Sequence, residues 1–227
     1  MCGRYSLNAT PQALADLFQL DGLPEVVPRY NIAPSQEVLA IRCTPLSGKR
    51  EPGLLRWGLI PPWAKSAKPG YGMINARAET LADKPAFRNA FRCRRCLVPA
   101  TGFYEWLAAP GGKRPFYIRL KKCVPFAFAG LWERWPGDGT TGPVDSCTII
   151  TTQANELVRP LHERMPVILD SKLFERWLSP ECSAHEELGT MLTPYRSDKM
   201  EAFPVGPRVN NPRSDDSTLI EPLCQVD

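Results

Sequence analysis

Cys2 is the residue whose type and position offer the most specific chemistry. Removal of Met1 would leave Cys2 with an α-amine of pKa about 7.7–8.0 beside a thiol of pKa about 8.5, so both groups are partly deprotonated near neutral pH. Such a 1,2-aminothiol condenses with an aldehyde, because the amine forms an imine and the thiolate then closes a five-membered thiazolidine ring. On position alone, Cys2 could equally be an ordinary small buried residue near a chain end.

Two other patterns have the spacing of metal or redox sites. Cys93 and Cys96 are spaced like two zinc ligands, but no second pair of this kind and no paired histidines complete a set of four. The same pair lacks the βαβ context of a thioredoxin-like redox site. His162 and Glu163 resemble the start of a zinc-protease helix, but Pro166 stands where the second histidine is required. We therefore expect no metal and no cofactor.

Six short blocks follow one another along the chain and are more specific together than any one alone. They are MCGRY at 1–5, RYNIAP at 29–34, WGLIPPWA at 57–64, NARAET at 75–80, GFYEW at 102–106 and HERMP at 162–166. In this order they resemble the SRAP family, which is named for SOS-response-associated peptidases and is associated with the processing of abasic sites in DNA. The resemblance covers residues 1 to about 206 and leaves a C-terminal tail, 207–227.

The resemblance implies that the protein is an abasic-site sensor of the DNA damage response. In this reading Cys2, once Met1 is removed, captures the ring-opened aldehyde of an abasic site in single-stranded DNA as a thiazolidine crosslink. The family name also implies a self-processing peptidase activity that removes Met1, for which a cellular aminopeptidase is the alternative. An abasic-site lyase activity is a further expectation.

The resemblance also assigns catalytic roles to Glu105, His162 and Asn75. An abasic sugar is mostly a closed hemiacetal, so proton-transfer groups must open it and assist imine formation and ring closure. The glutamate and histidine of the family match Glu105 and His162, and its sugar-holding asparagine matches Asn75, whose amide cannot titrate. Without the resemblance, Glu105 in a predicted strand could simply face solvent. We expect His185, in a Glu-rich segment, to be a solvated surface residue.

DNA contacts are expected from residues inside the matched blocks. Arg4, Arg77 and Arg164 can each offer a planar guanidinium to a phosphate. Pro34 and Trp63 are apolar surfaces on which a base or a duplex edge could rest, although Trp63 could instead be a core or rim residue. Some relatives carry a second aromatic residue after this tryptophan, whereas Ala64 follows here. We expect single-stranded DNA and single/double-strand junctions as partners, because Cys2 must reach a sugar exposed from the stack.

Two other function classes remain open. N-terminal-nucleophile amidohydrolases of one class also begin Met-Cys-Gly, and there the cysteine attacks an amide carbonyl; the further glycine- and asparagine-bearing blocks of that class are not found. A thiol peptidase belongs to the same alternative. The third hypothesis is a non-catalytic single-strand-binding module in which Cys2 is incidental.

Composition limits the remaining possibilities. Lys and Arg number 28 against 24 Asp and Glu, a net charge of +4, so contact with DNA must come from a few placed arginines. The sequence contains no run of about 18 apolar residues, which is the length that would predict a membrane span. The eight cysteines are thinly spread and no secretory leader precedes them, so we expect free thiols and a cytoplasmic protein. We also expect a monomer, and association with the nucleoid when the protein is bound to DNA.

The pattern of apolar residues predicts short strands and short helices, in keeping with 24 prolines among 227 residues. Thr10 and Pro11 open a short amphipathic helix that ends before Gly22. The predicted strands are 38–41, 54–59, 97–107, 116–120, 126–132 and 147–151, and the further helices are 84–92, 155–161, 171–178 and 185–192. These helices are too few for a doubly wound parallel sheet. We predict a single α+β domain over 1–227, with a largely antiparallel, partly closed, barrel-like sheet and short peripheral helices.

Overall fold

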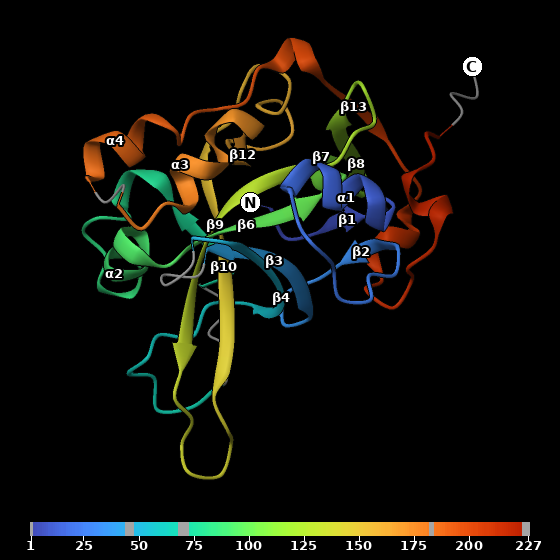
Figure 1. Ribbon diagram of the computed structural model, residues 1–227. Coiled ribbons are helices and arrows are strands. Elements are labelled where there is room, and N and C mark those ends of the chain that lie inside the picture. Colours follow the sequence, from blue (N-terminus) through green and yellow to red (C-terminus); the bar gives the residue numbers. More distant parts are fainter. Residues whose placement is uncertain (1, 44–47, 68–72, 182–183, 224–227) are drawn as a thin grey trace.

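Two β-sheets organise the computed structural model, which describes residues 2–43, 48–67, 73–181 and 184–223 (Figure 1). The smaller sheet has the strand order β13-β8-β7-β1-β2 and is antiparallel throughout. Its strands are β1 (Tyr5–Leu7), β2 (Arg29–Ile32), β7 (Gly102–Ala109), β8 (Gly112–Leu120) and β13 (Met200–Pro204).

The larger sheet closes on itself. Its strands are β3 (Glu37–Cys43), β4 (Arg50–Trp57), β5 (Asn75–Arg77), β6 (Arg95–Ala100), β9 (Phe126–Trp135), β10 (Val144–Gln153), β11 (Arg164–Pro166) and β12 (Ile168–Leu169). Because β10 pairs with both β4 and β9, the path β4-β3-β6-β9-β10 returns to its start. Only the pairings of β10 with β4 and β5 are parallel among these described strands. The expected α+β fold with a largely antiparallel, partly closed sheet is therefore confirmed.

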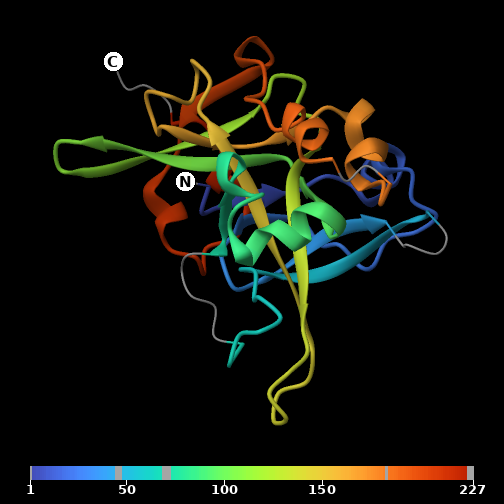
Figure 2. The ribbon, with the colours of Figure 1, turned by 90° about the vertical axis from the view of Figure 1, so that its left-hand side faces the viewer.

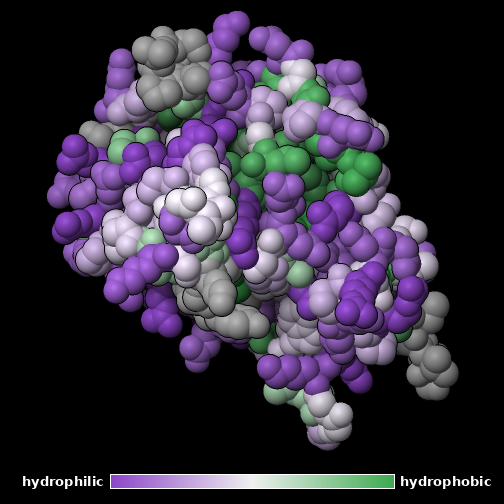
Figure 3. Space-filling model, turned by 90° about the horizontal axis from the view of Figure 1, so that it is seen from below, coloured by the Kyte–Doolittle hydropathy of each residue, from purple (hydrophilic) through white to green (hydrophobic). Residues whose placement is uncertain are grey.

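The core lies inside this closed sheet and between it and the smaller sheet. Trp57, Leu97, Phe128 and Ile149 are fully buried there. Consecutive residues of β6, β9 and β10 are buried, so both faces of these strands are covered. Figure 2 shows that β7 and β8 extend to one side as a long hairpin, while β9 and β10 form a second hairpin that points downward. The face seen from below is mostly hydrophilic, with its apolar side chains gathered in one area (Figure 3).

Short helices lie around the sheets, as the sequence predicts. They are α1 (Pro11–Phe18), α2 (Pro85–Cys93), α3 (Phe174–Leu178) and α4 (His185–Thr190). Thr10 caps α1, since its side chain accepts a hydrogen bond from the main-chain N–H of Ala13. None of the helices within the described ranges is long and apolar enough to cross a membrane.

The predicted helix over 155–161 is wrong. The structure has a turn there, with the amide of Arg159 bonded to the carbonyl of Asn155 and the amides of Leu161 and His162 both bonded to Val158. Pro160 lacks an N–H and disfavours helical backbone at the residue before it. The chain therefore turns instead of extending a helix, and it delivers His162 to the start of β11.

The predicted strand over 97–107 is two strands in two different sheets. β6 pairs with β9 in the larger sheet, whereas β7 pairs with β8 and β1 in the smaller one. The chain crosses from one sheet to the other at Thr101 and Gly102. A Cβ atom at Gly102 would lie 2.2 Å from Cζ of Tyr117, so only glycine fits at this crossing. The sequence prediction also omits the short strands β1 and β5. β1 follows the segment that contains Cys2, and β5 contains Asn75 and Arg77.

Candidate active site and nucleic-acid interface

The segment that contains Cys2 lies between the two sheets. The carbonyl of Arg4 accepts a hydrogen bond from the amide of Tyr104 at 3.0 Å, and Tyr5 pairs with Phe103 where β1 meets β7. On the other side, Asn75 at the start of β5 donates from Nδ2 to the carbonyl oxygen of Cys2 at 2.8 Å. Both sheets therefore hold the beginning of the chain in place.

The side chain of Cys2 is fully buried. Burial raises the pKa of its thiol well above the ordinary value, and the nearby Glu105 carboxylate raises it further. The thiol is therefore protonated at neutral pH in this environment. Because the thiolate is the nucleophilic form, chemistry at Cys2 requires a neighbouring group that accepts the proton.

Glu105 is buried and does not face solvent. It lies in β7, opposite Phe116 of β8, with 3% of its surface exposed. Burial raises the pKa of its carboxyl group above the ordinary range. A carboxyl group whose pKa is raised by burial and that lies next to a buried thiol can accept and return a proton, which is the property expected of an acid–base catalyst.

His162 presents one defined nitrogen for proton transfer. Its Nδ1 accepts a hydrogen bond from the main-chain N–H of Arg164 at 2.9 Å. A main-chain N–H can only donate, so the proton of the neutral ring lies on Nε2. Burial lowers the pKa of His162 below its ordinary value, which keeps the ring neutral at neutral pH. His162 is therefore a hydrogen-bond donor through Nε2.

Glu105 and His162 line the same cavity. This cavity has a volume of about 540 Å³, and its lining residues are Glu105, Trp106, Lys113, His162 and Asn210. Trp106 follows Glu105 in a matched block and could have been selected from the sequence. Lys113 and Asn210 lie outside all matched blocks, so no sequence signal indicated them.

A second, more basic cavity adjoins the first. It has a volume of about 590 Å³ and is lined by Arg77, Gln153, Ala154, Arg159, His162, Glu163 and Arg164. Since His162 lines both cavities, the two meet at this residue. Arg77 is exposed at the end of β5. Sequence reasoning did not select Arg159, which lies between matched blocks.

Arg164 is held rigidly at this second cavity. Its NH1 and NH2 atoms donate to the two carboxylate oxygens of Glu79 at 2.8 and 2.9 Å, and NH2 also donates to the carbonyl of Thr151 at 2.6 Å. Hydrogen bonding from Arg164 lowers the pKa of Glu79. A forked ion pair of this kind fixes the guanidinium plane.

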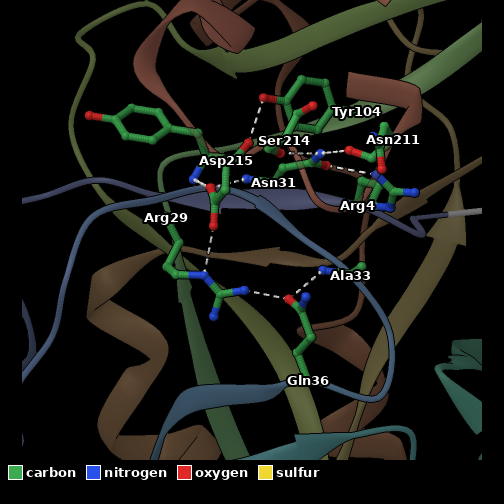
Figure 4. A network of polar contacts seen from close by, with 10 residues as sticks. Arg4, Arg29, Asn31, Ala33, Gln36, Tyr104, Asn211, Ser214 and Asp215 are labelled. Carbon is green, nitrogen blue, oxygen red and sulfur yellow. Dashed lines mark hydrogen bonds and ion pairs between the residues drawn. The ribbon is translucent and has the colours of Figure 1, made fainter. Parts of the chain in front are cut away.

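Three candidate DNA-binding residues lie apart from the two cavities. Arg4 donates to Oδ1 of Asn31 at 2.7 Å (Figure 4). It also donates to the carbonyl of Val209 at 2.8 Å. Trp63 is 61% exposed, which excludes the alternative of a core tryptophan. Pro34 is half-buried in the turn that follows β2.

The cysteines and the second histidine occupy ordinary positions. The six cysteines in the described part of the chain form no disulfide with one another, and Cys182 and Cys224 lie outside it. Cys93 is exposed whereas Cys96 is buried, so the pair does not share one environment. His185 is exposed, as expected, and stacks on Phe91. Across the described ranges, His, Cys, Asp and Glu side chains form no group of three or more that could hold a metal ion.

Comparison with known proteins identifies the family. The family model described as SOS response associated peptidase (SRAP) matches residues 1–212. The chain belongs to the SRAP family. Abasic site processing protein YoqW of Bacillus subtilis is 46% identical over 225 residues, which cover 97% of this chain and 99% of that protein. Abasic site processing protein HMCES of Gallus gallus is 30% identical over 74% of this chain and 56% of its own length.

Solved structures share the fold of this SRAP chain. A crystal structure of a protein from Bacteroides thetaiotaomicron superposes with a TM-score of 0.83 at 29% identity and covers 98% of this chain and 100% of that chain. A protein from Bordetella bronchiseptica gives a TM-score of 0.78 at 28% identity, over 90% of this chain and 100% of that chain. The arrangement of the two sheets is therefore shared among these proteins.

Proposed function

We propose that this SRAP-family protein captures abasic sites in single-stranded DNA through Cys2, after removal of Met1, as part of the DNA damage response. The observation that carries the proposal is the position of Cys2, which is held by Asn75 and lies close enough to Glu105 for that carboxylate to affect its pKa. The names of the relatives, abasic site processing proteins, supply the substrate class.

Glu105 and His162 divide the proton transfers in this proposal. Glu105 takes the proton of the sugar hydroxyl at C1, and Nε2 of His162 donates to the ring oxygen, so the hemiacetal opens to an aldehyde. The α-amine of Cys2 adds to the aldehyde carbon. Glu105 returns its proton to the departing oxygen, His162 regains its proton from the nitrogen, and water leaves to form the imine. Glu105 then accepts the thiol proton, sulfur adds to the imine carbon, and the nitrogen is protonated. One molecule of water is released for each thiazolidine formed.

The same residues support the two further activities that we propose. Hydrolysis of the bond between Met1 and Cys2 is the self-processing step; Met1 lies outside the described residues. The imine makes the proton at C2 of the sugar acidic, so its removal by Glu105 expels the 3′ phosphate and cleaves the strand, which is the lyase step.

The proposed DNA path runs through the basic cavity. Arg77 and Arg164 bind phosphates there, while the exposed Trp63 and the turn at Pro34 support a base or the end of a duplex. Arg4 contributes to DNA binding by steadying the segment next to Cys2, through its bonds to Asn31 and Val209. We propose a monomer that associates with the nucleoid when it is bound to DNA; size-exclusion chromatography tests the monomer.

A denaturing gel tests the central proposal. Purified protein is mixed with single-stranded DNA that carries one abasic site, and a heat-stable adduct is expected from the wild type but not from Cys2→Ala. Cys93→Ala is the matched control, because it removes an exposed thiol and must leave the adduct intact. Intact mass spectrometry is expected to show loss of Met1. Glu105→Ala and His162→Ala are each expected to slow capture by about 10²-fold or more.

Other outcomes would contradict the proposal. Glutamine hydrolysis without a DNA adduct would identify an amidohydrolase. Reversible, salt-sensitive DNA binding that Cys2→Ala leaves unchanged would identify a non-catalytic module. Equal capture in fully paired DNA would overturn the expected preference for single strands and junctions.

A further inference from the structure

The outer wall of the cavity at Glu105 comes from two parts of the chain that are distant in sequence. One part is the β7–β8 hairpin, which supplies Trp106 and Lys113, and the other is the C-terminal segment, which supplies Asn210. In the hairpin, Lys113 pairs with Ala108 and Trp106 pairs with Pro115, so Lys113 and Trp106 stand on the same face. The Lys113 ammonium lies close enough to Glu105 to favour its ionised form.

Asn210 is oriented by Trp106. The indole Nε1 donates to Oδ1 of Asn210 at 2.8 Å. Because this bond occupies the amide oxygen, the amide nitrogen lies on the other side of the group with two N–H donors. Asn210 is exposed at the cavity. The wall therefore presents an ammonium group and an amide donor, the combination that binds a phosphate oxygen.

The segment on both sides of Asn210 is tied to β2. Figure 4 shows the contacts that Asn211, Ser214 and Asp215, which follow Asn210, make with Asn31. Nδ2 of Asn31 donates to the carbonyls of Val209, Asn211 and Ser214 at 3.2, 3.0 and 2.8 Å. Asp215 accepts from the amide of Asn31 at 2.9 Å. Val209 also accepts from Arg4 at 2.8 Å. Residues 209 and 211 are thus both held, and Asn210 is positioned before any ligand arrives.

The charges of the two cavities indicate how a DNA strand would pass. The basic cavity carries Arg77 and Arg159 on one side of His162, and the cavity at Glu105 carries Lys113 on the other. A strand whose abasic sugar lies at His162 continues in both directions. Its phosphates on the two sides of the lesion would therefore enter different cavities.

We propose that Lys113 and Asn210 form a second phosphate-binding subsite, which holds the DNA strand on the side of the lesion opposite to the arginines. The inference rests on the proposed function and names binding residues that the family resemblance does not assign. Trp106 is a positioning residue in this subsite, because it acts by orienting the amide of Asn210.

Equilibrium binding in a Cys2→Ala background separates this subsite from capture. The probe is single-stranded DNA with one tetrahydrofuran analogue, which has no aldehyde. Lys113→Gln is expected to weaken binding about threefold to tenfold and to reduce the slope of log affinity against log salt by about 0.7, because one phosphate contact is lost. Lys113→Arg is expected to retain both values. Lys122→Gln, an exposed lysine beyond the end of β8, is the matched control and is expected to change neither.

DNA probes shortened on one side of the lesion test which side of the strand each cavity binds. Two probes end at the analogue, one without the 5′ nucleotides and the other without the 3′ nucleotides. The effects of Lys113→Gln and Asn210→Ala are expected to vanish with one probe, and the effect of Arg77→Gln with the other. Loss of both effects with the same probe, or an unchanged salt slope in Lys113→Gln, would overturn the subsite. Failure of the proposed function would look different, since the wild type would then form no adduct with abasic DNA.

Discussion

The side-chain amide of Asn75 donates to the main-chain carbonyl of Cys2 at 2.8 Å, so the first residue of β5 holds the residue that we propose as the nucleophile. The other atom of the same amide, Oδ1, is buried and has no hydrogen-bond partner among the described residues. Buried polar atoms are rarely left in this state. We infer that this oxygen accepts a hydrogen bond from the substrate.

Asn75→Ala is expected to slow adduct formation about tenfold, because loss of one hydrogen bond costs about 1–1.5 kcal/mol. Single-turnover capture of abasic DNA measures this rate. Asn89→Ala, an exposed asparagine on α2, is the control. An unchanged rate in Asn75→Ala would show that the bond to Cys2 does not position the nucleophile.

The rate of capture is expected to depend on the ionisation of Glu105. Burial raises the pKa of this carboxyl group, and the base is active only when it is deprotonated. The rate should therefore rise with pH through the raised pKa of Glu105. Glu105→Gln should remove this rise and slow the reaction by about 10²-fold. Lys113→Gln should move the rise to higher pH, since the Lys113 charge favours the carboxylate. A rise that persists in Glu105→Gln would assign it to another group.

The C-terminal segment is expected to depend on Asn31. Asn31→Ala leaves the carbonyls of Val209, Asn211 and Ser214 without this donor. The variant should lose about 1–3 kcal/mol of unfolding free energy, and residues 207–223 should become sensitive to limited proteolysis. Gln12→Ala, on the exposed surface of α1, is the control. Protease resistance equal to that of the wild type would show that other contacts hold the segment.

The crossing between the sheets is expected to tolerate no side chain at Gly102. Gly102→Ala places a methyl group 2.2 Å from the ring of Tyr117 and should lower the thermal midpoint by several degrees, because overpacking costs about 1–3 kcal/mol. Gly22→Ala, where a Cβ meets nothing within 4 Å, should be neutral. In Gly102→Ala/Tyr117→Ala the two effects should be less than additive. Additive losses would place the strain elsewhere.

The sequence by itself determined the elements that depend on local patterns. The Thr10 cap and the proline after it specify α1, and short runs of β-branched and aromatic residues bounded by Pro or Gly specify most of the long strands. The position of Cys2 and the order of the matched blocks also indicated the family. The helix expected over 155–161 failed for a local reason, since Pro160 interrupts it.

Only the tertiary structure decided which residues meet. Glu105 could have faced solvent, and it is buried because the chain changes sheets at Gly102 and β7 then pairs with β1. Asn210 reaches the cavity because Asn31 binds the residues on both sides of it. Local propensity carries no information about such pairings between distant segments, since they depend on how two sheets and a terminal segment bury their surfaces against one another.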